Sequence, residues 1–128
     1  MNTEVDAFLV KAQESLASAE ADFTARRYNS CANRSYYACF QAAIAALLRV
    51  GISPKRKWAH TFVQARFDEL VYRQKRYPAE LRGIWVRLHS LREQADYTSN
   101  PVTETEARRA SRLSRNFVQA IQARGGEN

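Results

Sequence analysis

The segment LREQADY, residues 91–97, brings together three side chains that can bind an anion: Arg92, Asp96 and Tyr97. Arg92 and Asp96 are four residues apart in a helical pattern, so the simplest interpretation is an exposed ion pair worth about 0.3–0.5 kcal/mol. Arg92 also lies on the face of Trp85, at the edge of a buried stripe, where a guanidinium needs a carboxylate, hydroxyl or phosphate partner. We therefore predict an anion-binding corner in which Asp96 orients Arg92 and Tyr97 adds a hydroxyl.

Two other stretches carry residues suited to RNA or nucleotide contact. In NRSYYACF, residues 33–40, Arg34 and Tyr37 give an otherwise apolar helix a polar face, although core tyrosines with bonded hydroxyls have the same pattern. In KRKWAH, residues 55–60, one indole ring stands among bases, which suits base stacking and phosphate contact. The alternative for this second stretch is a solvated loop whose ring folds back onto the protein. We predict that four residues of this stretch contact the backbone of a nucleic acid: Lys55, Arg56, Lys57 and Trp58.

The chain has two histidines, His60 and His89. Either could serve as the base of a metal-independent ribonuclease in which Arg92 stabilises the charge of the phosphorane. His89 lies one helical turn before Arg92 on the same face. A lone histidine on a helix is more often a packing or surface residue, so both interpretations stay open. The residues that we predict to bind the ligand are Arg34, Tyr37, His60, Arg92, Asp96 and Tyr97.

Cysteine and histidine spacing argues against a metal site. Cys31 and Cys39 are never paired with a histidine at ligand spacing, and no Glu-x-x-His tetrapeptide for a di-iron bundle occurs. The two cysteines are eight residues apart along one helix, about 12 Å at ~1.5 Å per residue, which is too far for a mutual disulfide. We expect reduced, buried cysteines and neither a metal nor a cofactor.

Length and composition favour one helical domain covering residues 1–128. Of these residues 45% are hydrophobic, and a chain of this size buries roughly two-thirds of its unfolded surface. Only four glycines and three prolines favour helix over sheet and predict an all-α fold. The acidic N-terminus is unlike a secretory signal, and no apolar run reaches the ~18 residues of a membrane span. We expect a cytoplasmic protein without membrane contact.

The basic excess is concentrated in the middle of the chain. The net charge is +7, and residues 25–76 hold eleven bases and two acids, whereas residues 1–24 hold five acids and one base. A positive patch favours an RNA, DNA or nucleotide partner. A solubilising surface in which arginine stems cover apolar area is the alternative.

Hydrophobic periodicity and end signals predict four long helices and one short one. Gly51 suits the end of the second helix, Pro78 the first residue of the fourth, and Thr103 with Glu106 a capping box for the fifth. The second helix is apolar almost all round between residues 36 and 48, so it should lie at the centre. Short connections predict an up-and-down antiparallel bundle. The predicted helices span about residues 3–24, 28–50, 59–72, 78–97 and 103–124, with an exposed loop at 52–58.

The order of these motifs resembles the HEPN domain family, in particular the uncharacterised prokaryotic branch often found beside minimal nucleotidyltransferases. The resemblance covers about residues 5–122, and its most specific motifs are SYYACF at 35–40 and LREQADY at 91–97. It implies a helical bundle that is usually a symmetric homodimer. It also implies a role in RNA processing, nucleotide binding or toxin–antitoxin pairs, with a nucleotidyltransferase protein as a partner.

The ribonucleases of that family resemble one another in an Arg followed four to six residues later by a His. Arg92 matches the Arg, but Asp96, Tyr97 and Thr98 stand where the His is expected. Metal-independent RNA cleavage needs a group that titrates near neutrality, so we expect no strong catalysis. Tyr97 is two residues nearer to Arg92 than the modified Tyr of the family's Arg…His…Tyr toxins. The resemblance therefore does not assign the role of that tyrosine to Tyr97.

Three functions follow, from different classes. The first is a bundle that binds RNA, a nucleotide or a nucleotidyltransferase partner around Arg92 without strong catalysis. The second is a weak ribonuclease with a degenerate motif, in which Arg92 acts with His60 or His89. The third is a non-catalytic scaffold for another protein.

Overall fold

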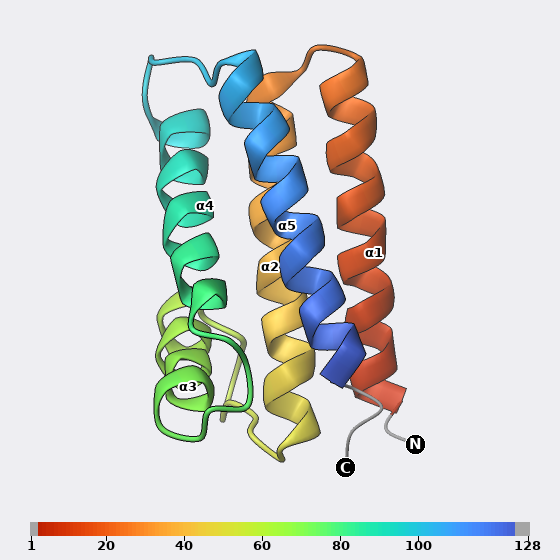
Figure 1. Cartoon of the computed structure of the whole chain (residues 1–128), viewed down its shortest axis with the longest axis vertical. Coiled ribbons are helices and arrows are strands. Elements are labelled where there is room, and N and C mark those ends of the chain that lie inside the picture. The colour runs from red at the N-terminus through yellow and green to blue at the C-terminus, as the bar shows by residue number, and fades with distance from the viewer. Residues whose placement is uncertain (1–2, 125–128) are drawn as a thin grey trace.

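Five helices and their connections make up residues 3–124, the part of the chain that the computed structural model describes (Figure 1). No strand occurs within this range, so the predicted all-α class is confirmed. None of the helices described is both long and apolar enough to span a membrane. The helices are α1 Thr3–Thr24, α2 Tyr28–Arg49, α3 His60–Tyr72, α4 Glu80–Tyr97 and α5 Glu104–Arg124.

The central element is α2, which contacts each of the other four helices. Between Tyr36 and Leu48 every side chain is buried except those of Tyr37 and Gln41, which are partly exposed. This confirms the prediction of a central helix. The helices α1, α2, α4 and α5 run along the long axis of the molecule, and the short α3 packs at the lower end of α4 (Figure 1).

The helix ends follow the sequence signals, with one difference. Beyond α2, Gly51 has a φ of 81° and donates its N–H to Leu48, while Ile52 donates to Leu47, the two bonds of a Schellman motif. Before α5, the N–H of Thr103 donates to Glu106 (3.0 Å) and that of Glu106 to the Thr103 hydroxyl (3.1 Å), which completes the capping box.

The prediction that α4 begins at Pro78 is wrong by two residues. The helix begins at Glu80. In the preceding turn, the N–H of Leu81 donates to the carbonyl of Pro78 and that of Arg82 to the carbonyl of Ala79, each three residues back along the chain. The fixed φ of proline suits such a tight turn as well as it suits a first α-helical turn.

Large rings fill the core between α2, α3, α4 and α5. Tyr36, Phe67, Trp85 and Phe117 are each at most 2% exposed. Phe62 packs against this core but is only partly buried. Cys31 and Cys39 are free and buried, as predicted.

The connection between α2 and α3 is an irregular loop in which Lys55, Arg56 and Lys57 are exposed, as predicted. Trp58, at its end, is partly buried and folds back onto the bundle. Its ring lies 6.2 Å from that of Phe8 in α1 and 6.2 Å from that of Phe62 in α3. This loop leads directly into His60, the first residue of α3.

Candidate functional site

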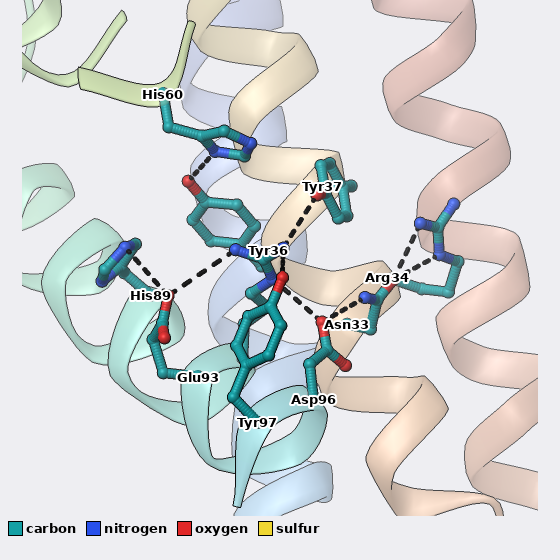
Figure 2. Close-up of polar contacts among 10 residues, drawn as sticks. Asn33, Arg34, Tyr36, Tyr37, His60, His89, Glu93, Asp96 and Tyr97 are labelled. Atoms are coloured by element: carbon teal, nitrogen blue, oxygen red, sulfur yellow. Dashed lines mark hydrogen bonds and ion pairs between the residues drawn. The ribbon is translucent and has the colours of Figure 1, made fainter.

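The guanidinium of Arg92 lies in a polar cradle formed by α2 and α4. Its Nε donates to Asp96 Oδ2 at 2.9 Å, and its Nη2 donates to the hydroxyls of Tyr37 (3.2 Å) and Tyr97 (3.1 Å) (Figure 2). Only 13% of the Arg92 side chain is exposed. The predicted contact of Arg92 with Asp96 and Tyr97 is therefore present, and Tyr37 joins it from the central helix.

Three tyrosine rings surround the same guanidinium. Its central carbon lies 5.2 Å from the ring centroid of Tyr97, 5.5 Å from that of Tyr37 and 5.6 Å from that of Tyr36. Burial acts to lower the pKa of Arg92, but the interactions with Tyr37, Asp96 and Tyr97 outweigh it and raise the pKa. Arg92 is therefore a fixed positive charge at any physiological pH.

The remaining nitrogen, Nη1, makes no hydrogen bond within residues 3–124. Its nearest carboxylate is that of Glu93, whose Oε1 lies 3.7 Å away, beyond hydrogen-bond length. The same oxygen lies 3.8 Å from Nε2 of His89 (Figure 2). Glu93 is not among the predicted site residues, although its position four residues after His89 on one helix is a signal that could have identified it.

A second layer of polar contacts holds Asp96 in place. Asn33 of α2 donates from Nδ2 to Asp96 Oδ2 at 2.8 Å, and its Oδ1 accepts from Nε and Nη2 of Arg34 at 3.0 and 2.8 Å (Figure 2). The Arg34 guanidinium also lies 5.1 Å from the centroid of the Tyr37 ring. A continuous chain from Arg34 through Asn33 and Asp96 to Arg92 therefore links the two helices. No spacing rule in the sequence identified Asn33.

Both histidines lie against Tyr36. The Tyr36 hydroxyl is hydrogen-bonded to Nδ1 of His60 at 2.7 Å, and the His60 ring stacks on Phe40 with centroids 4.5 Å apart. The His89 ring meets the Tyr36 ring edge-on at 5.7 Å. Burial, followed by the charges of Arg92 and His89, lowers the pKa of His60 below 6.5. His60 is therefore neutral at pH 7.

The structure brings one predicted set together and leaves the other apart. Arg34, Tyr37, His60, Arg92, Asp96 and Tyr97 form one connected cluster, which we call the Arg92 site, and His89 lies beside it. Lys55, Arg56 and Lys57 are exposed on the α2–α3 loop, and the ring contacts of Trp58 are to Phe8 and Phe62 rather than to this cluster.

A cavity of about 270 Å³ lies beside Asp96 and is lined by Asn33, Arg34 and Asp22 among others. A larger cavity, of about 570 Å³, lies between α4 and α5 instead. Within residues 3–124 no three Cys, His, Asp or Glu side chains are grouped so that they could hold a metal ion.

Two comparisons with known proteins found a match for this chain. The model of the HEPN domain family matches residues 5–124. The chain is also 34% identical over 119 residues to the Methanocaldococcus jannaschii protein named "Putative toxin MJ0605", an alignment that covers 92% of this chain and 86% of that protein.

Proposed function

This chain belongs to the HEPN domain family, and we propose that it is the toxin-like member of a toxin–antitoxin pair and binds RNA or a nucleotide by a phosphate at Arg92. The name of the archaeal relative supports the toxin-like role. The geometry of the Arg92 site supports the phosphate.

The observation that carries the proposal is the partition of the Arg92 donors. A guanidinium has five N–H groups. One of them bonds Asp96, two bond tyrosine hydroxyls, and the two on Nη1 have no hydrogen bond within the described chain. Because the other three fix the plane of the group, Nη1 meets a phosphate without further loss of side-chain entropy.

The proposed position of the phosphate is that of the Glu93 carboxylate. Its Oε1 lies between Arg92 Nη1 (3.7 Å) and His89 Nε2 (3.8 Å), and its side chain is 47% exposed. A half-exposed carboxylate without a hydrogen bond can turn into solvent when a phosphate oxygen takes its place. Arg92 and His89 then contact the phosphate from two sides.

A co-purification experiment tests this proposal. We expect the wild-type protein, purified at low salt, to carry a nucleotide or an RNA fragment. The ratio of absorbance at 260 and 280 nm detects this molecule, and mass spectrometry identifies it. Arg92→Lys should lose it, and Arg66→Lys, on α3, should keep it. Equal amounts of bound nucleotide in all three proteins would refute the assignment.

Two partner proposals accompany this function and rest on the family. We propose a homodimer, which light scattering at micromolar concentration tests, and a single 14.7 kDa species would contradict it. We also propose a cytoplasmic nucleotidyltransferase protein as the antitoxin-like partner. Co-elution with the product of a neighbouring nucleotidyltransferase reading frame tests this proposal, and separate elution of the two would refute it.

One observation favours a second function, metal-independent RNA cleavage. His60, His89 and Arg92 all lie against the ring of Tyr36, at 5.6, 5.7 and 5.6 Å. Neutral His60, in the tautomer that donates its Nδ1 proton to the Tyr36 hydroxyl, could take the 2′-hydroxyl proton on Nε2 as that oxygen attacks phosphorus. His89 would protonate the departing 5′ oxygen, and Arg92 would stabilise the phosphorane. The product would be a 2′,3′-cyclic phosphate.

Cleavage is tested with end-labelled single-stranded RNA in the presence of EDTA. The second function predicts fragments with cyclic phosphate ends from the wild-type protein and none from His60→Asn. Binding without cleavage by both proteins would leave phosphate binding as the function.

A further inference from the structure

A long hollow of the surface lies along α4 and α5, away from the Arg92 site. Two adjacent cavities, of about 570 and 490 Å³, share the lining residues Gly83, Arg87 and Arg109 and so form one groove. It extends from Glu80 to Gln94 of α4, about 21 Å at ~1.5 Å per residue. We call this surface the α4–α5 groove.

The floor of the α4–α5 groove is aliphatic and open. Leu88 and Ala110 line one half, and Leu81 and Leu113 line the other. At Gly83 the floor is bare backbone, since a Cβ there would meet no atom within 4 Å. Val86, also in the lining, is 43% exposed and is one of few large apolar side chains exposed in the described chain.

The walls of the groove carry positive charge without partners. Arg87 from α4 and Arg109 from α5 are exposed and make no ion pair or hydrogen bond within residues 3–124. The third arginine of the lining, Arg82, is paired with Asp68 at 3.6 Å. Two acids also line the groove: Glu106 accepts from the N–H of Thr103 in the cap of α5, and Glu80, the first residue of α4, lies at one end of the groove. The groove is therefore apolar below and basic on both walls.

We propose that the α4–α5 groove binds an acidic amphipathic helix of a partner protein. Its length fits about four helical turns, whose apolar stripe would cover Val86 and the bare backbone at Gly83. Carboxylates flanking the stripe would meet Arg87 on one wall and Arg109 on the other. The proposal does not depend on the phosphate function, because Arg92 faces α2 from the same helix.

The chemistry of the groove favours a protein over RNA. Single-stranded RNA needs rings on which its bases stack and a row of cations for its backbone. The lining of both cavities contains no aromatic residue, and only its two unpaired arginines are free to meet phosphates. An aliphatic floor between two arginines is instead complementary to leucines between two rows of glutamates.

The experiment uses a fluorescein-labelled synthetic helix of 16 residues, with leucines at i, i+3, i+4 and i+7 and glutamates on both flanks. Fluorescence anisotropy measures its affinity for the full-length protein and for two groove variants. Gly83→Leu fills the floor, and Arg87→Glu/Arg109→Glu reverses both walls. Gly83→Ala and the charge-matched Arg73→Glu/Lys75→Glu, at exposed residues outside the groove, are the controls, and melting temperatures verify that each variant is folded.

We expect the wild-type protein and both controls to bind the peptide and both groove variants to bind it at least tenfold more weakly. A peptide with lysines in place of glutamates should not bind. Absence of binding to the wild-type protein, or full binding to folded Gly83→Leu, would overturn the proposal. A loss of self-association in the groove variants, measured by sedimentation, would overturn it in favour of a second copy of this chain. A loss of RNA affinity in those variants would overturn it in favour of RNA.

Discussion

Arg92 and Asp96, one turn apart on α4, are joined by a 2.9 Å hydrogen bond from Nε to Oδ2, and the same Oδ2 accepts a second bond from Asn33 of α2. The carboxylate is therefore anchored on the central helix and holds the guanidinium in one orientation. The tyrosine hydroxyls accept from Nη2, so Nη1 is the nitrogen without a hydrogen bond within residues 3–124, and it is there that we propose an anion binds.

The first prediction concerns Glu93, whose Oε1 lies 3.7 Å from Arg92 Nη1. Glu93→Gln removes the negative charge that competes with a phosphate while preserving the size of the side chain. An exposed pair of this kind is worth up to about 1 kcal/mol, so phosphate or RNA affinity should rise about threefold. Isothermal titration calorimetry measures the change, with Glu69→Gln on α3 as the control. An affinity that falls or stays constant would contradict the role of Glu93.

The second prediction is a pH dependence of stability that originates at His60. Burial, then Arg92 and His89, lower its pKa below 6.5, so the unfolded chain binds this proton more readily than the folded protein does. Neutral His60 therefore contributes to the free energy of unfolding. This contribution is complete above pH 6.5 and is lost as the pH falls through the lower pKa of the folded state. His60 is only partly buried, so solvent screening limits the loss to a fraction of a kcal/mol.

Urea unfolding at pH 7.5 and 5.5 measures that loss. The wild-type protein should lose more stability across this interval than His60→Asn, which does not titrate, because every other group titrates in both proteins. Equal losses would assign the dependence to groups other than His60.

The fold was predictable because its signals are local. The spacing of apolar residues set all five helices, and the Thr103–Glu106 pair and Gly51 set helix ends that the structure confirms. The start of α4 was misjudged because Pro78 fits a tight turn and a first helical turn equally well.

The candidate site was predictable only within one helix. The contact between Arg92 and Asp96 follows from their spacing of four residues. The bonds from Arg92 to Tyr37 and from Asn33 to Asp96 span 55 and 63 residues and depend on the rotation of α2 against α4, which no local pattern fixes.

A third prediction tests the cap of α5. Thr103→Ala removes the hydroxyl that accepts from the N–H of Glu106 and should lower the free energy of unfolding by about 1 kcal/mol. The hydroxyl of Thr105, two residues later, makes no hydrogen bond within the described chain. Thr105→Ala should therefore change the free energy of unfolding by less than about 0.5 kcal/mol. Urea denaturation of both variants decides the matter, and equal effects would contradict the cap.

A fourth prediction concerns RNA and the α2–α3 loop. Lys55, Arg56 and Lys57 are exposed and make no ion pair within residues 3–124. Replacing all three with alanine should weaken binding of single-stranded RNA at ~50 mM salt and reduce the slope of log affinity against log salt by about 2, because each phosphate contact on a single strand contributes about 0.7.

The matched triple variant on α5 replaces Arg108, Arg112 and Arg115 with alanine. It should reduce the slope less, because Arg108 is paired with Glu104 and Arg115 with Glu20. If the α5 variant reduces the slope more than the loop variant does, the RNA-binding surface is on α5 and not on the loop. If the wild-type protein does not bind RNA, the basic loop only increases solubility.

The most direct measurement of the central claim is the phosphate affinity of Arg92→Lys beside Tyr97→Phe. Lysine keeps the charge but loses the planar fork, so the account predicts at least a tenfold weaker affinity for a 5′-phosphorylated oligonucleotide, about 1.4 kcal/mol, with a melting temperature lowered by a few degrees. Tyr97→Phe removes one partner of Nη2, leaves Nη1 unchanged, and should retain binding. Wild-type affinity in folded Arg92→Lys would contradict the account and leave Arg92, Asp96 and Tyr97 as a structural clasp.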